Sequence, residues 1–471
     1  MSHVMTTRVH AFGDDALGDL DTVGVAAAIA DRTISAREAA EAASARAAVV
    51  NPVLNAIQHP DFDRGLAAAD HPAPGVFSGV PTFVKDNTDV EGLPSDQGSL
   101  AVRSRPAPAH AEFTRQYLSA GFTVLGKSTM PEFGFNATTE YQTLPPTRNP
   151  WNTGYSAGAS SGGSAALVAS GVVPIAHAND GGGSIRIPAA ACGLVGLKPT
   201  RGRVVAAAEA ATLPIDIISN GAVTRTVRDT AHFLAATQAY RPAPGLQPLG
   251  LVEGASDRRL RVGLIVDSVT GPTDDDTRKA VLATADLLGS LGHDVHEIEL
   301  PVDERFMEDF KHYWGLLAFS TQHFGRRVMG PNFDKAQTDG LTRGLARRFV
   351  RQAWRTPMAL RGLKASELRY RAAFDDVDLI LSPTLGHTTP ELGFLSPAVE
   401  FPLMFERLVR YVAFTPINNA AGGPAISLPL GRSSADLPIG VHFSAPHGHE
   451  QRLLEIAYEL EAAQPFARIQ G

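Results

Sequence analysis

The chain has 471 residues, of which 44% are hydrophobic and 19% are charged, a composition typical of a globular protein with a large core. A net charge of −7 without any basic stripe gives no support for nucleic-acid binding. A single cysteine, Cys192, excludes a disulfide framework and fits a reducing cytoplasm. The sequence has no run of 18 or more apolar residues, so we expect no transmembrane helix.

The first organised part of the chain, about residues 20–58, is predicted to be helical. Ser35 and Glu38 have the spacing of a capping box at the start of an alanine-rich run. We expect Asn51 and Pro52 to end that helix, because the residue before a proline disfavours helical geometry. These helices are interpreted as packing elements on a larger body.

Beyond residue 72, short apolar runs alternate with amphipathic ones. This alternation predicts an α/β fold: a single large α/β/α domain over residues 1–471, with a central mixed, largely parallel twisted sheet covered by helices. Residues 303–372 differ, because Phe, Trp, Arg and Leu recur there at helical spacing with no strand pattern. We expect them to form a helical insertion over one side of the sheet.

Two glycine-rich loops, residues 158–164 and 179–186, bracket a predicted helix and strand. Glycine lets backbone N–H groups converge on one point, and converging N–H groups bind anions. Both loops also carry serines, Ser160 and Ser184 among them. A serine hydroxyl beside an anion-binding concavity is typical of acyl-transfer enzymes.

Taken singly, these features have simpler explanations. Ser160 and Ser161 could cap the helix that follows them, and Lys85 could be a solvated residue at a strand end. Neither the Walker pattern nor the dinucleotide fingerprint occurs, and His177 is not accompanied by a Gly-x-Ser-x-Gly elbow. Histidines at metal spacing are also absent, so we expect no metal and no organic cofactor.

Taken together, the motifs resemble the amidase signature family. Ser160 follows Lys85 by 75 residues, and Ser184 follows Ser160 by 24, as in that family. The resemblance extends over about residues 21–466 and includes these further segments: 79–86, 149–152, 193–202, 422–429 and 438–441. Residues 176–180 and 192–203 are similar to the matching segments of family members that resemble 6-aminohexanoate-cyclic-dimer hydrolase.

The resemblance implies a role for each matching residue. It makes Ser184 the nucleophile, Ser160 a bridging serine after a cis peptide bond, and Lys85 the base. The remaining residues follow from the same resemblance: backbone N–H groups of Gly181, Gly182, Gly183 and Ser184 as the oxyanion hole, Ser161, Asp180 and Arg186 as supports, and Phe133, Phe135 and Asn419 as substrate-binding residues.

The expected function is hydrolysis of a small linear or cyclic carboxylic amide through a seryl acyl-enzyme. One alternative is the glutaminase subunit of a tRNA-dependent amidotransferase, in which charged residues would have to hold the carboxylate and amino group of glutamine. The other is an inactive binding protein, which is disfavoured because all three catalytic side chains are present. We expect the binding partner to be a small-molecule amide, and neither a nucleic acid nor a membrane. We expect a cytoplasmic location, and a homodimer remains open.

Overall fold

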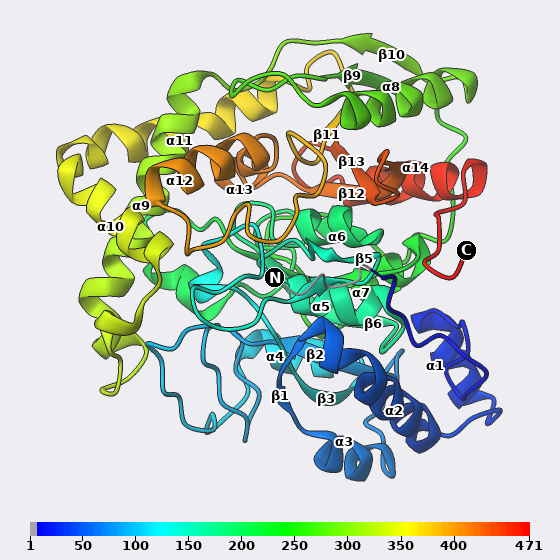
Figure 1. Ribbon diagram of the computed structural model, residues 1–471. Coiled ribbons are helices and arrows are strands. Elements are labelled where there is room, and N and C mark those ends of the chain that lie inside the picture. Colours follow the sequence, from blue (N-terminus) through cyan, green and yellow to red (C-terminus); the bar gives the residue numbers. More distant parts are fainter. Residues whose placement is uncertain (1–6) are drawn as a thin grey trace.

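The computed structural model describes residues 7–471 (Figure 1). Its helices are α1 Thr22–Ala30, α2 Ala36–Leu54, α3 Phe62–Ala69, α4 Glu112–Leu118, α5 Gly162–Ala169, α6 Arg186–Cys192, α7 Val227–Tyr240, α8 Asp275–Ser290, α9 Glu304–Val328, α10 Gly340–Arg351, α11 Thr356–Ala372, α12 Phe401–Tyr411, α13 Pro416–Ala421 and α14 Glu450–Ala463. Its strands are β1 Ile57–Pro60, β2 Pro81–Lys85, β3 Thr123–Ser128, β4 Arg148–Asn149, β5 Asn152–Ser156, β6 Ile175–Asp180, β7 Val195–Lys198, β8 Ser219–Thr224, β9 Arg261–Leu264, β10 Asp294–Glu297, β11 Leu379–Pro383, β12 Ala425–Arg432 and β13 Pro438–Ser444.

An eight-stranded mixed sheet forms the centre, in the order β10-β9-β11-β13-β12-β7-β8-β6. The α/β class and the mixed central sheet are therefore confirmed. The expected parallel majority is wrong, because five of the seven neighbouring pairs are antiparallel. The crossover units do produce parallel strands: β6 and β7, joined through α6, run the same way. However, β8 inserts between β6 and β7, and β13 likewise inserts between β11 and β12.

A second, three-stranded sheet has the order β1-β3-β2, so β2 and β3 are not strands of the central sheet. Strand β2 nevertheless lies along β6 at the central sheet's edge. The Thr82 hydroxyl donates to the Ile175 carbonyl oxygen at 2.9 Å, and the Lys85 backbone N–H donates to His177 Nδ1 at 3.2 Å. The C-terminal end of β2 is thereby fixed beside the C-terminal end of β6.

Helix α2 begins as expected and ends later than expected. The Ser35 side chain accepts from the Glu38 N–H, and the Glu38 carboxylate accepts from the Ser35 N–H, a complete capping box. The helix then continues through Pro52 to Leu54, so the predicted end is wrong. The Asn51 side chain instead caps the chain beyond the helix, because its oxygen accepts from the N–H groups of residues 56 and 57.

Residues 304–372 contain α9, α10, α11 and two short 3-10 turns. The three long helices lie together along one side of the molecule (Figure 1). Helix α9 packs against both α10 and α11. Within residues 7–471, no helix is long and apolar enough to cross a membrane.

Candidate active site

Three chain segments meet at the site. Lys85 is the last residue of β2, Ser160 lies in the loop before α5, and residues 181–185 connect β6 to α6. Because β2 lies along β6, Lys85 at the end of β2 reaches both glycine-rich loops, where it contacts Ser160 and Asn179. The fold therefore brings together the motifs that the sequence keeps apart.

The Lys85 amine is in direct contact with Ser160. Its Nζ lies 2.6 Å from Ser160 Oγ and 2.7 Å from Asn179 Oδ1, and the Lys85 side chain is completely buried. The peptide bond between Ala159 and Ser160 is cis, as the family resemblance implies. A lysine in this position can exchange a proton with the Ser160 hydroxyl.

Ser160 and Ser184 line one pocket, which encloses about 790 Å³ of space including its open mouth. Ser160 and Ser184 are 3% and 8% exposed, so both are largely shielded from bulk solvent. Ser184 is thus placed where a bound substrate could meet its hydroxyl.

The loop before Ser184 supplies backbone N–H groups, but not all four are open. The Gly183 N–H donates to Asp180 Oδ1 at 2.6 Å, so Gly183 does not fit the role of an oxyanion donor assigned to it. Within residues 7–471, the N–H groups of Gly181, Gly182 and Ser184 have no hydrogen-bond acceptor. These three residues line the pocket, so their N–H groups are available to a group bound there.

Glycine is required at one of these positions and not at another. Gly183 has φ +130°, and a Cβ there would lie 2.5 Å from the Thr415 hydroxyl oxygen. A Cβ on Gly181 would meet nothing closer than an Ile218 carbon at 3.7 Å. The backbone at position 181 therefore accepts a side chain without losing its N–H.

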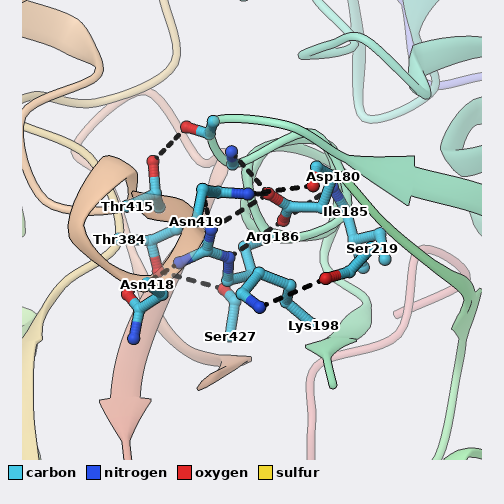
Figure 2. A network of polar contacts seen from close by, with 12 residues as sticks. Asp180, Ile185, Arg186, Lys198, Ser219, Thr384, Thr415, Asn418, Asn419 and Ser427 are labelled. Atoms are coloured by element: carbon cyan, nitrogen blue, oxygen red, sulfur yellow. Dashed lines mark hydrogen bonds and ion pairs between the residues drawn. The ribbon is translucent and has the colours of Figure 1, made fainter. Parts of the chain in front are cut away.

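Asp180 and Arg186 form a buried ion pair behind the loop (Figure 2). Arg186 Nε lies 2.9 Å from Asp180 Oδ2, and both side chains are fully buried. Burial alone would raise the pKa of Asp180, but the Arg186 charge and its hydrogen bonds hold that pKa well below its usual value of 3.8. The ionised carboxylate also accepts from the N–H groups of Gly183 and Ile185, so the pair fixes the loop that carries Ser184.

We expect Asp180→Asn to lower the free energy of unfolding by about 3–5 kcal/mol, because it leaves the buried Arg186 charge unpaired. In the wild type, the Asp180 pKa is lower in the folded than in the unfolded state. Its contribution to stability is thus present above about pH 4 and lost as the pH falls below that. Urea unfolding across pH 3–7 measures both effects.

Asp436→Asn is the matched control for this prediction. Asp436 pairs with Arg432 at 2.9 Å, yet its side chain is 59% exposed. Exposed ion pairs contribute less than about 1 kcal/mol, so this variant should unfold almost as the wild type does. Equal destabilisation by both variants would contradict the supporting role given to Asp180.

Asn419 was expected to contact substrate, and the structure contradicts that expectation. Its side chain is 1% exposed and does not line the pocket. Its amide nitrogen donates to Asp180 Oδ1 at 2.8 Å and to the Ile217 carbonyl oxygen at 2.9 Å, while its oxygen accepts from Arg186 (Figure 2). Asn419 therefore holds the ion pair in place and does not face the pocket.

The pocket walls are largely apolar. Phe133 and Phe135 line it, as expected, and the opposite wall comes from α9 and comprises Phe310, Tyr313, Trp314 and Leu317. Sequence reasoning missed the α9 residues, because apolar side chains at helical spacing predict core packing equally well. Among the described residues that line this pocket there is no Asp, Glu, Lys or Arg.

His177 offers no alternative base for the serines. Its Nδ1 already accepts the Lys85 backbone N–H, and its ring packs 4.7 Å from that of Phe113. Burial, with the nearby Lys85 charge, lowers the pKa of His177 to about 3, so the ring is neutral. Over residues 7–471, no group of three or more His, Cys, Asp or Glu side chains is arranged to hold a metal ion.

Comparison with known proteins identifies the family. A family profile described as Amidase matches residues 38–454. The chain is 48% identical over 466 residues to the putative amidase AmiC of Mycobacterium tuberculosis, with 98% of each chain covered. It is 34% identical over 479 residues to the 6-aminohexanoate-cyclic-dimer hydrolase of a Pseudomonas species, with 95% of each covered.

A solved structure of 6-aminohexanoate cyclic dimer hydrolase, complexed with substrate, is similar to the whole fold. The TM-score is 0.86 at 30% sequence identity, covering 97% of this chain and 99% of that chain. The family profile and the two relatives extend across almost the full sequence, and the fold agrees with them. The chain therefore belongs to the amidase signature family and is an amide-hydrolysing enzyme.

Proposed function

We propose that this enzyme hydrolyses the C–N bond of a small linear or cyclic carboxylic amide through a seryl acyl-enzyme. The observation that carries the proposal is the 2.6 Å contact between Lys85 Nζ and Ser160 Oγ, in a pocket that Ser160 shares with Ser184. The relatives named for cyclic-dimer hydrolysis support including cyclic amides among the substrates.

In the proposed reaction, neutral Lys85 takes the proton of the Ser160 hydroxyl while Ser160 takes the proton of Ser184. Ser184 Oγ then forms a bond to the amide carbonyl carbon, and the N–H groups of Gly181, Gly182 and Ser184 stabilise the oxyanion. The proton on Lys85 returns through Ser160 to the amine nitrogen as the C–N bond breaks. Water attacks the resulting ester by the same relay, which releases the acid and restores the Ser184 hydroxyl.

A covalent probe tests this proposal directly. A small fluorophosphonate with an apolar chain should label the enzyme once, and peptide mapping should find the adduct on Ser184. Labelling should slow as the pH falls, because the relay needs a neutral lysine. An adduct on Ser160 or Ser161 in place of Ser184 would show that the nucleophile has been misassigned.

The glutaminase alternative makes a different prediction about substrate. A pocket without charged side chains gives the ammonium and carboxylate groups of glutamine no ionic partner, and an unpaired buried charge costs several kcal/mol. We expect kcat/KM for hexanamide or benzamide to exceed that for glutamine by about 100-fold or more, since each 1.4 kcal/mol is a factor of ten. Parallel ammonia-release assays measure the ratio, and a preference for glutamine would favour the glutaminase.

A further inference from the structure

The Lys85 amine contacts groups of different kinds. Its Nζ lies 2.6 Å from the Ser160 hydroxyl oxygen and 2.7 Å from Asn179 Oδ1, and the Asn179 carbonyl oxygen lies further off at 3.5 Å. An amide or carbonyl oxygen can only accept a hydrogen bond, whereas a hydroxyl can donate or accept. Toward Asn179, then, the amine must direct an N–H bond.

We propose that Asn179 is a positioning residue that fixes the orientation of the Lys85 amine during catalysis. A neutral primary amine has two N–H bonds and one lone pair, in tetrahedral directions. When N–H bonds point at Asn179, the lone pair is left facing the Ser160 hydroxyl, from which it takes the proton. This inference rests on the proposed base role of Lys85 and adds a residue that the sequence motifs did not mark.

Asn179 is itself held firmly enough to act this way. Its side-chain nitrogen donates to Asn87 Oδ1 at 3.1 Å, which leaves its oxygen facing Lys85. Its backbone is held by Ser161, whose hydroxyl lies 3.3 Å from both the N–H and the carbonyl oxygen of Asn179. Asn179 is 5% exposed and stands next to Asp180 at the end of β6.

An amide oxygen carries no formal charge, so it stabilises the ammonium form of lysine much less than a carboxylate in the same place would. Titratable groups near Lys85 include Asp86, which follows it in the chain, Lys127 on β3, and the neutral His177 on β6. Burial raises the pKa of Asp86 to about 6, although Lys127, 3.9 Å away, opposes that shift. A carboxylate oxygen in the place of Asn179 Oδ1 would lie 2.7 Å from Lys85 Nζ. That is closer than the 3.9 Å between Lys127 Nζ and Asp86 Oδ1.

The pH dependence of kcat/KM for an apolar amide tests the inference. Asn179→Asp keeps the size of the side chain and adds a negative charge beside Nζ, so the ammonium form becomes favoured. We expect the midpoint of the acid limb to rise by at least one pH unit, with at least a tenfold loss of kcat/KM below the wild-type midpoint. Asn179→Leu removes the acceptor, and kcat should fall by about 10- to 100-fold with KM changed less than threefold.

Asn220→Asp is the matched control, because Asn220 is the register partner of Asn179 on β8 and has its amide bonded to the Val205 carbonyl oxygen. In the Asn220→Asp variant, the midpoint of the acid limb of kcat/KM should move by less than half a pH unit. An equal shift in both aspartate variants, or an unmoved limb in Asn179→Asp, would overturn the inference. Circular dichroism and thermal unfolding show that each variant is folded before its kinetics are compared.

Lys85→Arg in the same assay distinguishes a wrong role for Asn179 from a wrong role for Lys85. If that variant is inactive while both Asn179 variants behave as the wild type, the lysine is the base and only the role of Asn179 is wrong. If Lys85→Arg is fully active, the proposed relay itself is wrong.

Discussion

Replacing Ser184 by alanine is expected to lower kcat for amide hydrolysis by about 10⁴- to 10⁶-fold, since removing the nucleophile of a serine hydrolase has an effect of this size. The physical reason is that the variant lacks the hydroxyl proposed to form the acyl-enzyme beside the loop N–H groups. KM for an apolar amide should change little, because the pocket walls of Phe133, Phe135 and α9 are untouched. Steady-state kinetics and the absence of fluorophosphonate labelling measure the effect.

Ser170→Ala is the control, since it deletes one buried hydroxyl from the same region of the chain. Ser170 follows α5 and contacts the Leu167 carbonyl oxygen at 3.4 Å, away from the pocket. Its activity should equal that of the wild type. A Ser184→Ala enzyme that keeps more than a few per cent of wild-type kcat would assign the chemistry to another residue and leave the glycine loop as an anion site only.

The chain-local features of the fold were predictable because short-range chemistry determines them. The capping box at Ser35 and Glu38 and the alternation of apolar runs follow from contacts within a few residues. Strand order does not, because it depends on which distant segments pair. Nothing in the local pattern of β8 indicates that it inserts between β6 and β7, which is why a parallel majority was expected.

The same distinction holds within the site. The family motifs predicted that Lys85, Ser160 and Ser184 act together; in the structure Lys85 contacts Ser160, and the two serines line one pocket. The sequence could not show that the Gly183 N–H bonds to Asp180, because an open loop and a closed one have the same residues. Nor could it show that Asn419 turns toward Arg186 and away from the pocket.

Asn179 shows a different limit of sequence reasoning. Asparagine before an aspartate is a common turn composition, so neither its type nor its position indicates contact with a lysine. Only the packing of β2 along β6 brings the Lys85 amine to 2.7 Å from its side-chain oxygen. Residues that act through such long-range contacts become visible once the strands are placed.

Replacing Lys85 should have the second-largest effect on activity, and two variants distinguish its possible roles. Lys85→Met removes the base, and Lys85→Arg keeps the positive charge but cannot release a proton near neutral pH. We expect both to lower kcat by about 10²- to 10⁴-fold, the usual contribution of a general base. In the wild type, kcat/KM should rise with pH as Lys85 loses its proton, at an apparent pKa below the ~10.4 of a free lysine, because desolvation disfavours the ammonium form.

Lys127→Met provides the matched control, because Lys127 is equally buried but contacts Ser95 and Asp86 and not the serines of the pocket. It should reduce thermal stability and leave kcat of the folded enzyme within about tenfold of the wild type, with the alkaline rise intact. The Lys85 variants should lose that rise. A Lys85→Arg enzyme that hydrolyses amides at the wild-type rate would instead make the positive charge, and not the lone pair, the property that Ser160 requires.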